Sequence, residues 1–173
     1  MSHKTLWITS ILLSIIVVTA LILKELGYSI VYQGSTSMPK GFYWVSPVKQ
    51  LNKGDIVVFN PPEATEKFLW KRHWLPEGAS MMKHVEAVPG DMVCKSKGAI
   101  WINEKRFAQV YRFYTLGKRL PGLSFCEKLG MDEYLLMSTD IARSFDGRYF
   151  GPVKKSDIKG RAGLLFKVDY NEQ

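Results

Sequence analysis

An uncharged apolar run near the N-terminus constrains this chain most strongly. Residues 6–23 read LWITSILLSIIVVTALIL and contain no charged side chain. A helix needs roughly 20 apolar residues to cross a bilayer. A cleavable secretory signal is the alternative, but its apolar core is usually about 7 to 15 residues long, and no A-x-A-like site follows this run. The run predicts an uncleaved anchor, with residues 1–26 as leader and transmembrane helix and residues 27–173 as one domain.

Charges on either side of the run indicate its orientation. His3, Lys4 and the terminal amine precede it, whereas Lys24 and Glu25 nearly cancel each other after it. Because basic flanks tend to stay in the cytoplasm, the bulk of the chain is expected outside it.

Two cysteines, Cys94 and Cys126, lie in the part of the chain expected outside the cytoplasm. An oxidising compartment permits a disulfide between them. In the chain-entropy model such a loop closure stabilises the fold by roughly 3 to 4 kcal/mol. Two buried free thiols are the alternative, since sequence gives no distances.

The formal charge of +8 indicates an anionic partner, either nucleic acid or lipid headgroups. The basic residues are scattered and form no nucleic-acid recognition motif. Together with the apolar run, the charge favours a membrane surface and no nucleic acid.

Beyond Gly27 the sequence changes to short apolar runs separated by Gly, Pro, Asn and Asp, which is typical of a β-rich domain. The runs are rich in β-branched and aromatic residues and are short enough to be strands. The fold class is therefore mainly β, with one N-terminal helix. The predicted strands are 28–33, 41–46, 55–60, 80–88, 99–103, 133–138 and 162–168.

Two segments lack a strand pattern. Residues 61–79 begin with two prolines and end in Pro-Glu-Gly, which predicts a short helix or an exposed loop. Residues 110–130 mix aromatic and basic side chains without clean periodicity, and we interpret them as a surface excursion.

The stretch GSTSMPKGFYW, residues 34–44, offers several hydroxyl groups as nucleophiles. A serine needs an adjacent base to become a good nucleophile. The three histidines, His3, His73 and His84, are interpreted as leader, surface and strand residues, and no G-x-S-x-G motif is present. A Ser-His-Asp arrangement is therefore not expected.

Lys83 is a different candidate base, because it interrupts the apolar run ASMMKHVEAV. Neighbouring side chains of a strand point to opposite faces, so only one of Lys83 and His84 can face a given site. A lysine in a strand usually faces water. If Lys83 faces the interior, burial lowers its pKa from about 10.4, and a neutral lysine is a competent general base.

Four segments of the chain occur in a characteristic order: STSMP (35–39), KGDIVVF (53–59), MMKHVEAVPGD (81–91) and RSFDGRYFGPV (143–153). Together they resemble the bacterial type I signal peptidases, which use a Ser-Lys dyad. The short Ser-Met-Pro form, followed by KGFYW, is most similar to the TraF-type peptidases of conjugative transfer systems, which mature pilin precursors.

The resemblance implies a role for each matching position. Ser37 would be the nucleophile and Lys83 its base. Ser35 would join the Ser37 backbone N–H in binding the oxyanion. Ser144 would orient the lysine, and the ion pair formed by Asp146 and Arg148 would support the site. The resemblance implies no cofactor and no metal.

Some of these positions also have a structural reading. Taken alone, Ser144, Asp146 and Arg148 form a polar turn with a surface ion pair worth about 0 to 1 kcal/mol. Gly147 stands where ordinary signal peptidases have a second serine, and residues 137–144 replace their usual Gly-Asp-Asn lead-in. These departures place the supporting hydrogen bonds in question.

The resemblance further implies a signal-peptidase-like β-barrel or sandwich, held by a single-pass anchor in the bacterial inner membrane with its catalytic domain in the periplasm. The expected substrate is a membrane-embedded preprotein or prepilin, which is cleaved and in some systems cyclised. Other conjugation or type IV secretion components are further expected partners. A general type I signal peptidase and a non-catalytic anchored β module are the alternatives.

The aromatic side chains Phe42, Tyr43 and Trp44 either lie at the lipid headgroups or belong to the core. Trp70 and Trp74, with the basic residues between them, form a second candidate membrane contact.

Overall fold

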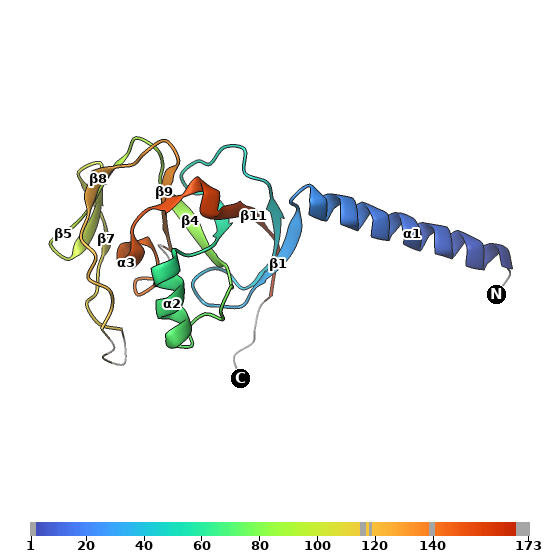
Figure 1. Ribbon diagram of the computed structural model, residues 1–173, viewed down its shortest axis with the longest axis horizontal. Coiled ribbons are helices and arrows are strands. Elements are labelled where there is room, and N and C mark those ends of the chain that lie inside the picture. Colours follow the sequence, from blue (N-terminus) through green and yellow to red (C-terminus); the bar gives the residue numbers. More distant parts are fainter. Residues whose placement is uncertain (1–2, 115–116, 118, 139–140, 169–173) are drawn as a thin grey trace.

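The computed structural model describes residues 3–114, 117, 119–138 and 141–168. The helix α1, His3–Glu25, is long and apolar enough to cross a membrane, and none of its apolar window is buried. It extends away from the rest of the chain and leads directly into the first strand (Figure 1).

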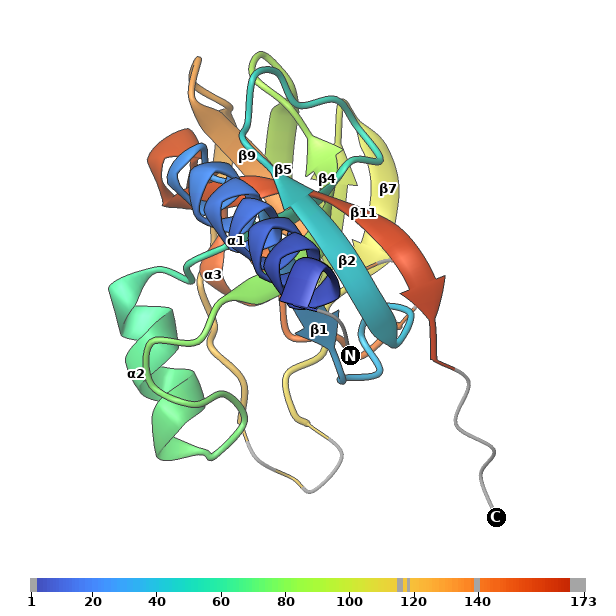
Figure 2. The same cartoon turned by 90° about the vertical axis from the view of Figure 1, so that its right-hand side faces the viewer.

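A seven-stranded antiparallel sheet forms the larger β layer. Its spatial order is β1-β2-β11-β3-β4-β9-β10. Strands from the two ends of the chain, β2 and β11, are neighbours (Figure 2). The strands are β1 (Ser29–Gln33), β2 (Gly41–Ser46), β3 (Ile56–Phe59), β4 (Met81–Ala87), β9 (Glu133–Met137), β10 (Val153–Lys154) and β11 (Ile158–Lys167).

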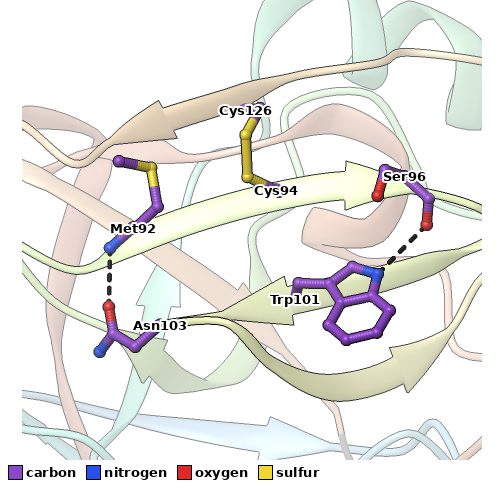
Figure 3. The surroundings of a disulfide bond; sticks show 6 residues. All are labelled: Met92, Cys94, Ser96, Trp101, Asn103 and Cys126. Carbon is purple, nitrogen blue, oxygen red and sulfur yellow. Dashed lines mark hydrogen bonds between the residues drawn. A yellow bond between two sulfur atoms is a disulfide. The ribbon is translucent and has the colours of Figure 1, made fainter.

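A smaller antiparallel sheet, with the order β7-β6-β5-β8, lies at the end of the molecule opposite α1 (Figure 1). Its strands are β5 (Met92–Ser96), β6 (Ala99–Ile102), β7 (Lys105–Gln109) and β8 (Cys126–Lys128). Cys94 of β5 and Cys126 of β8 stand opposite each other and are joined by a disulfide (Figure 3). The structure therefore has the disulfide and not the two free thiols.

Apolar side chains on alternate positions of the strands build the core. Val57, Phe59, Val85 and Leu136 belong to one cluster at the centre of the large sheet. Residues such as Val93 and Ile100 form a second cluster under the small sheet.

The mainly β fold class is confirmed, and every predicted strand overlaps a strand of the structure. The last predicted strand, 162–168, begins four residues earlier, at Ile158. The strands β5, β7, β8 and β10 were not predicted, because most of their side chains are polar or exposed and show no apolar alternation. Residues 110–130, interpreted as a surface excursion, end in the exposed strand β8, whose pairing with β5 was not predicted.

Two short helices interrupt the β structure. Residues 61–79 contain the helix α2, Glu63–Lys71, which begins directly after the two prolines. Its acidic residues in the first turn and Lys71 in the last turn match the helix dipole. The helix α3, Gly147–Phe150, starts at Asp146, whose carboxylate accepts a hydrogen bond from the Arg148 backbone N–H. A 3-10 turn, Lys155–Asp157, precedes β11.

Aromatic residues of β2 divide between its two faces. Tyr43 is fully buried, whereas Phe42 and Trp44 are half-buried on the opposite face. The headgroup interpretation therefore does not hold for Tyr43, which belongs to the core.

Candidate active site

A cavity of about 390 Å³ brings together four of the predicted site residues, Ser35, Ser37, Lys83 and Ser144. The two serines of the 34–44 stretch come from the loop after β1, the lysine from β4, and Ser144 from the segment before α3. Ser35 and Ser144, 109 positions apart in sequence, thus line one cavity, and the pairing of β4 with β9 brings the segment that carries Ser144 beside Lys83.

Lys83 is buried in this cavity wall. It is 2% exposed, pairs with Val57 of the neighbouring strand, and donates a hydrogen bond from Nζ to Ser144 Oγ at 3.2 Å. Burial lowers the pKa of Lys83 to about 8, although the carboxylate of Asp146 opposes the shift and Arg148 reinforces it. A large fraction of this amine is therefore neutral in mildly alkaline solution.

The Ser37 hydroxyl lies on a short chain of polar groups. Its Oγ is 3.1 Å from Ser35 Oγ, and the Gln33 side-chain amide donates a hydrogen bond to Ser35 Oγ at 2.6 Å. Within the described residues, Lys83 donates a hydrogen bond to Ser144 and none to Ser37. The two groups share a cavity but are not in direct hydrogen-bond contact here.

Residues after Ser37 fix the loop to the core. Met38 is buried at 3% exposure, and Ser138 Oγ lies 3.9 Å from its sulfur atom. The Tyr43 hydroxyl donates a hydrogen bond to the Pro39 carbonyl at 2.8 Å. The loop that carries Ser37 is therefore fixed from both β2 and the end of β9.

Asp146 and Arg148 form a buried ion pair and not a surface one. Asp146 is fully buried and Arg148 is 2% exposed. The Arg148 Nε donates to Asp146 Oδ1 at 2.9 Å, and its Nη2 donates to Oδ2 at 2.8 Å. The guanidinium also donates to the backbone carbonyls of Ser138, Ile141 and Ala142. The value of about 0 to 1 kcal/mol for an exposed pair does not apply to this network.

Ser138 connects the ion pair of Asp146 and Arg148 to the loop that carries Ser37. Its backbone N–H donates to Asp146 Oδ2 at 3.0 Å, and its carbonyl accepts from Arg148. Its hydroxyl contacts Met38, the residue after Ser37. Sequence reasoning missed Ser138, because nothing in the run 133–138 separates it from the end of a strand.

Gly147 has no room for a side chain. A Cβ at this position would lie 2.8 Å from the Leu136 carbonyl oxygen and 2.8 Å from Leu135 Cδ1. This crowding is a steric reason for glycine here, in addition to the missing hydrogen bond that the sequence resemblance suggested.

None of the three histidines, His3, His73 and His84, lines the cavity. His84 follows Lys83 on β4 and is half-buried, whereas His73 is exposed in the turn after α2 with a positive φ of 55°. In the described part of the chain, no group of three His, Cys, Asp or Glu side chains is arranged to hold a metal ion.

Three aromatic side chains form one wall of the cavity, and the sequence had assigned Trp74 to a membrane contact instead. Trp74, Tyr114 and Phe145 all line it. The Trp74 ring centroid lies 4.7 Å from that of Tyr114 and 5.9 Å from that of Phe145. Trp74 is therefore a cavity residue, while Trp70, which is 48% exposed, remains at the surface.

Comparison with known proteins places this chain in a family. The model of the family described as "Signal peptidase, peptidase S26" matches residues 3–167. A plasmid transfer protein TraF of Escherichia coli is 35% identical over 154 residues, which cover 82% of this chain and 86% of the relative. A probable signal peptidase I-2 of Synechocystis is 28% identical over 115 residues, covering 66% of this chain and 47% of that protein.

Among solved structures, a signal peptidase I from Enterococcus faecalis aligns with 69% of this chain and 99% of its own at 20% identity and a TM-score of 0.39. The family match extends over nearly the whole sequence, from α1 to the end of β11. This chain therefore belongs to the signal peptidase family, peptidase S26, and is a hydrolase similar to signal peptidase I.

Proposed function

We propose that Ser37 and Lys83 form the Ser-Lys dyad of a membrane-anchored endopeptidase that cleaves exported precursors. One observation carries the proposal: a lysine that is 2% exposed, with its pKa lowered to about 8, shares the wall of a 390 Å³ cavity with Ser37. A buried, partly neutral amine beside a candidate nucleophile is the arrangement that general-base catalysis requires.

In the proposed reaction, Ser37 Oγ attacks the scissile carbonyl carbon, and its proton passes to the lone pair of the neutral Lys83 amine. The bond from Lys83 to Ser144 uses a hydrogen of that amine and keeps the group at the cavity wall. Collapse of the tetrahedral intermediate breaks the C–N bond, and the lysine returns the proton to the departing amine. For this transfer, Lys83 Nζ and Ser37 Oγ must come within hydrogen-bond distance, because no hydrogen bond joins them in the described structure.

Further groups have supporting roles in this proposal. The Ser35 hydroxyl and the Ser37 backbone N–H bind the oxyanion, and losing one such donor commonly costs about 10² to 10³ in rate. Asp146 and Arg148 act through Ser138 and the Ser144 segment, to which their hydrogen bonds lead.

The proposed substrate is a pilin precursor of a conjugative transfer system. Support comes from the relative named plasmid transfer protein TraF, of which the alignment covers 86%, against 47% of the signal peptidase I-2 relative. The acyl-enzyme at Ser37 is then resolved by water or by an incoming amine, which would close the product into a ring. General preprotein processing is the alternative.

We place residues 27–173 in the periplasm, beside the inner-membrane surface. The leader charges favour this orientation. Only residues 26–28 separate α1 from β1, so the large sheet starts at the membrane. Ile30, Tyr32 and Phe166 are 59%, 48% and 57% exposed, and the rings of Phe42 and Phe166 are 4.9 Å apart. These apolar side chains suit contact with the headgroup region.

Co-expression with a pilin precursor tests the proposal. Ser37→Ala and Lys83→Ala are each expected to abolish cleavage while leaving the protein folded and membrane-bound. The exposed residues Ser124 and Lys105, outside the cavity, provide matched controls, and Ser124→Ala and Lys105→Ala should cleave normally. Cleavage retained by both site variants would end the peptidase proposal and favour a non-catalytic module.

Mass spectrometry of the released product distinguishes its two fates. A cyclic product is lighter than the linear one by one water molecule. Processing of ordinary secreted preproteins, but not of the pilin precursor, would instead favour the general signal peptidase.

A further inference from the structure

Gln33 begins a directed chain of hydrogen bonds to the candidate nucleophile. Its Nε2 donates to Ser35 Oγ at 2.6 Å and lies 3.2 Å from the Ser35 carbonyl oxygen. Ser35 Oγ in turn lies 3.1 Å from Ser37 Oγ, where either hydroxyl is able to donate. All three residues line the same cavity.

The chemistry of the amide group sets the direction of the first bond. An amide N–H₂ only donates, so the Ser35 oxygen accepts, and the Ser35 proton must point away from Gln33. A hydroxyl that accepts a hydrogen bond is polarised and becomes a better donor itself. The remaining neighbour at hydrogen-bond distance from Ser35 Oγ, among the described residues, is Ser37 Oγ.

The Gln33 backbone is firmly placed. It is the last residue of β1 and pairs with Gly41 of β2. Gly41 packs so closely on β11 that a Cβ there would lie 2.3 Å from the Phe166 carbonyl oxygen. The amide of Gln33 therefore projects from a rigid strand end, while Ser35 lies in the loop that follows.

We propose that Gln33 is a positioning residue that orients the Ser35 hydroxyl as a donor toward Ser37 and toward the oxyanion formed there. The inference rests on the proposed function, since it needs Ser37 as nucleophile. With Ser35 donating, the Ser37 hydroxyl keeps its own proton for Lys83. When the carbonyl oxygen of the substrate becomes negative, the Ser35 proton needs only a small rotation to reach it.

Two substitutions of Gln33 distinguish the loss of its hydrogen-bond donor from the effect of an added negative charge. Gln33→Glu is close in shape, but its carboxylate accepts and would draw the Ser35 proton away from the reaction. Gln33→Met keeps the length, adds no charge and removes the donor. Each is combined with Ser35→Ala in the full-length, detergent-solubilised protein. Gln109→Glu makes the same change of charge on β7, outside the cavity.

We expect Gln33→Glu to lower kcat by about 10- to 100-fold and Gln33→Met by somewhat less, because each removes part of an oxyanion donor worth about 10² to 10³. KM is expected to change by less than about twofold, since the effect concerns the transition state. In the Ser35→Ala background, Gln33→Met should cause no further loss of kcat. Gln109→Glu should match the parent protein.

Several results would overturn the inference. An unchanged kcat in Gln33→Met, or an equal loss with and without Ser35, would show that Gln33 does not act through Ser35. A fall in thermal stability that parallels the fall in kcat would indicate a structural role instead. Retained cleavage by Ser37→Ala would defeat the proposed function itself. If Ser37→Ala abolishes cleavage but the Gln33 variants cleave as well as the parent protein, only this inference is defeated.

Discussion

Lys83 Nζ lies 3.2 Å from Ser144 Oγ, and both side chains are buried at 2% and 4% exposure. The amine is thus held by a neutral hydroxyl and not by a carboxylate. A carboxylate in direct contact would favour the charged form, whereas a hydroxyl can accept an N–H from either the charged or the neutral amine. The hydrogen bond therefore fixes the position of the Lys83 amine without strongly favouring its protonated form.

The first prediction concerns the pH dependence of cleavage. Burial lowers the pKa of Lys83 to about 8, so its neutral, proton-accepting form increases as the pH rises through that value. We expect kcat/KM to increase with pH and level off above an apparent pKa near 8. Burial also lowers the pKa of Lys95, which lies outside the cavity, so Lys95→Met serves as control and should leave the profile unchanged. A profile that is flat from pH 6 to 10 would contradict the role of Lys83.

The second prediction concerns stability. Because the folded protein holds Lys83 at a pKa of about 8 against 10.5 in the unfolded chain, the charged amine destabilises the fold below pH 8. This cost is relieved as the pH rises from about 8 to 10.5, where the unfolded chain binds more protons. Lys83→Met should therefore be inactive but up to about 3 kcal/mol more stable at neutral pH. Chemical denaturation measures the change, and a clear loss of stability would contradict it.

The third prediction concerns the buried ion pair. Asp146→Asn leaves the Arg148 guanidinium without its carboxylate in a dry site, which should cost about 3 to 5 kcal/mol. Glu63→Gln breaks the exposed pair with Lys67 and serves as the control, with a far smaller expected effect because solvent screens this pair. Equal and small effects of the two substitutions in urea unfolding would show that the buried network is not a stabilising element.

The fourth prediction concerns Gly147. Replacing Gly147 by serine places a Cβ against the Leu136 carbonyl and the Leu135 side chain. We expect Gly147→Ser to lower stability by about 1 to 3 kcal/mol and to leave activity no higher than in the parent. Gly163→Ser is the control, because a Cβ there meets nothing within 4 Å. A more active and equally stable Gly147→Ser would contradict the steric explanation.

The fifth prediction concerns the disulfide between β5 and β8. Its cysteines are 32 residues apart, so breaking it should cost roughly 3 to 4 kcal/mol in the chain-entropy model. The bond lies in the small sheet, and of the segment between β7 and β8 only Tyr114, twelve residues before Cys126, lines the cavity among the described residues. Cys94→Ala with Cys126→Ala should therefore lower the unfolding temperature but leave kcat nearly unchanged at temperatures where the protein is folded. Full stability under reducing conditions would contradict this.

Most helices and strands with a clear apolar pattern were predictable from the local sequence. The uncharged run 6–23 predicts α1, because a membrane span needs only length and lack of charge. Alternation along 80–88 predicts that Lys83 and His84 face opposite ways, and the structure buries Lys83 while His84 is only half-buried. Strands with apolar alternation were predicted for the same reason, whereas the largely polar β7 and β8 were not.

The sequence by itself determined which residues were available as nucleophile and base, and that a single helix near the N-terminus is apolar enough to span a membrane. Only the tertiary structure decided that Asp146 and Arg148 are buried, that Ser138 joins them to Met38, and that Gln33 reaches Ser35. Burial and hydrogen-bond partners depend on which distant strands become neighbours, as β4 and β9 do here. No local pattern encodes that choice, because it results from packing across the whole sheet.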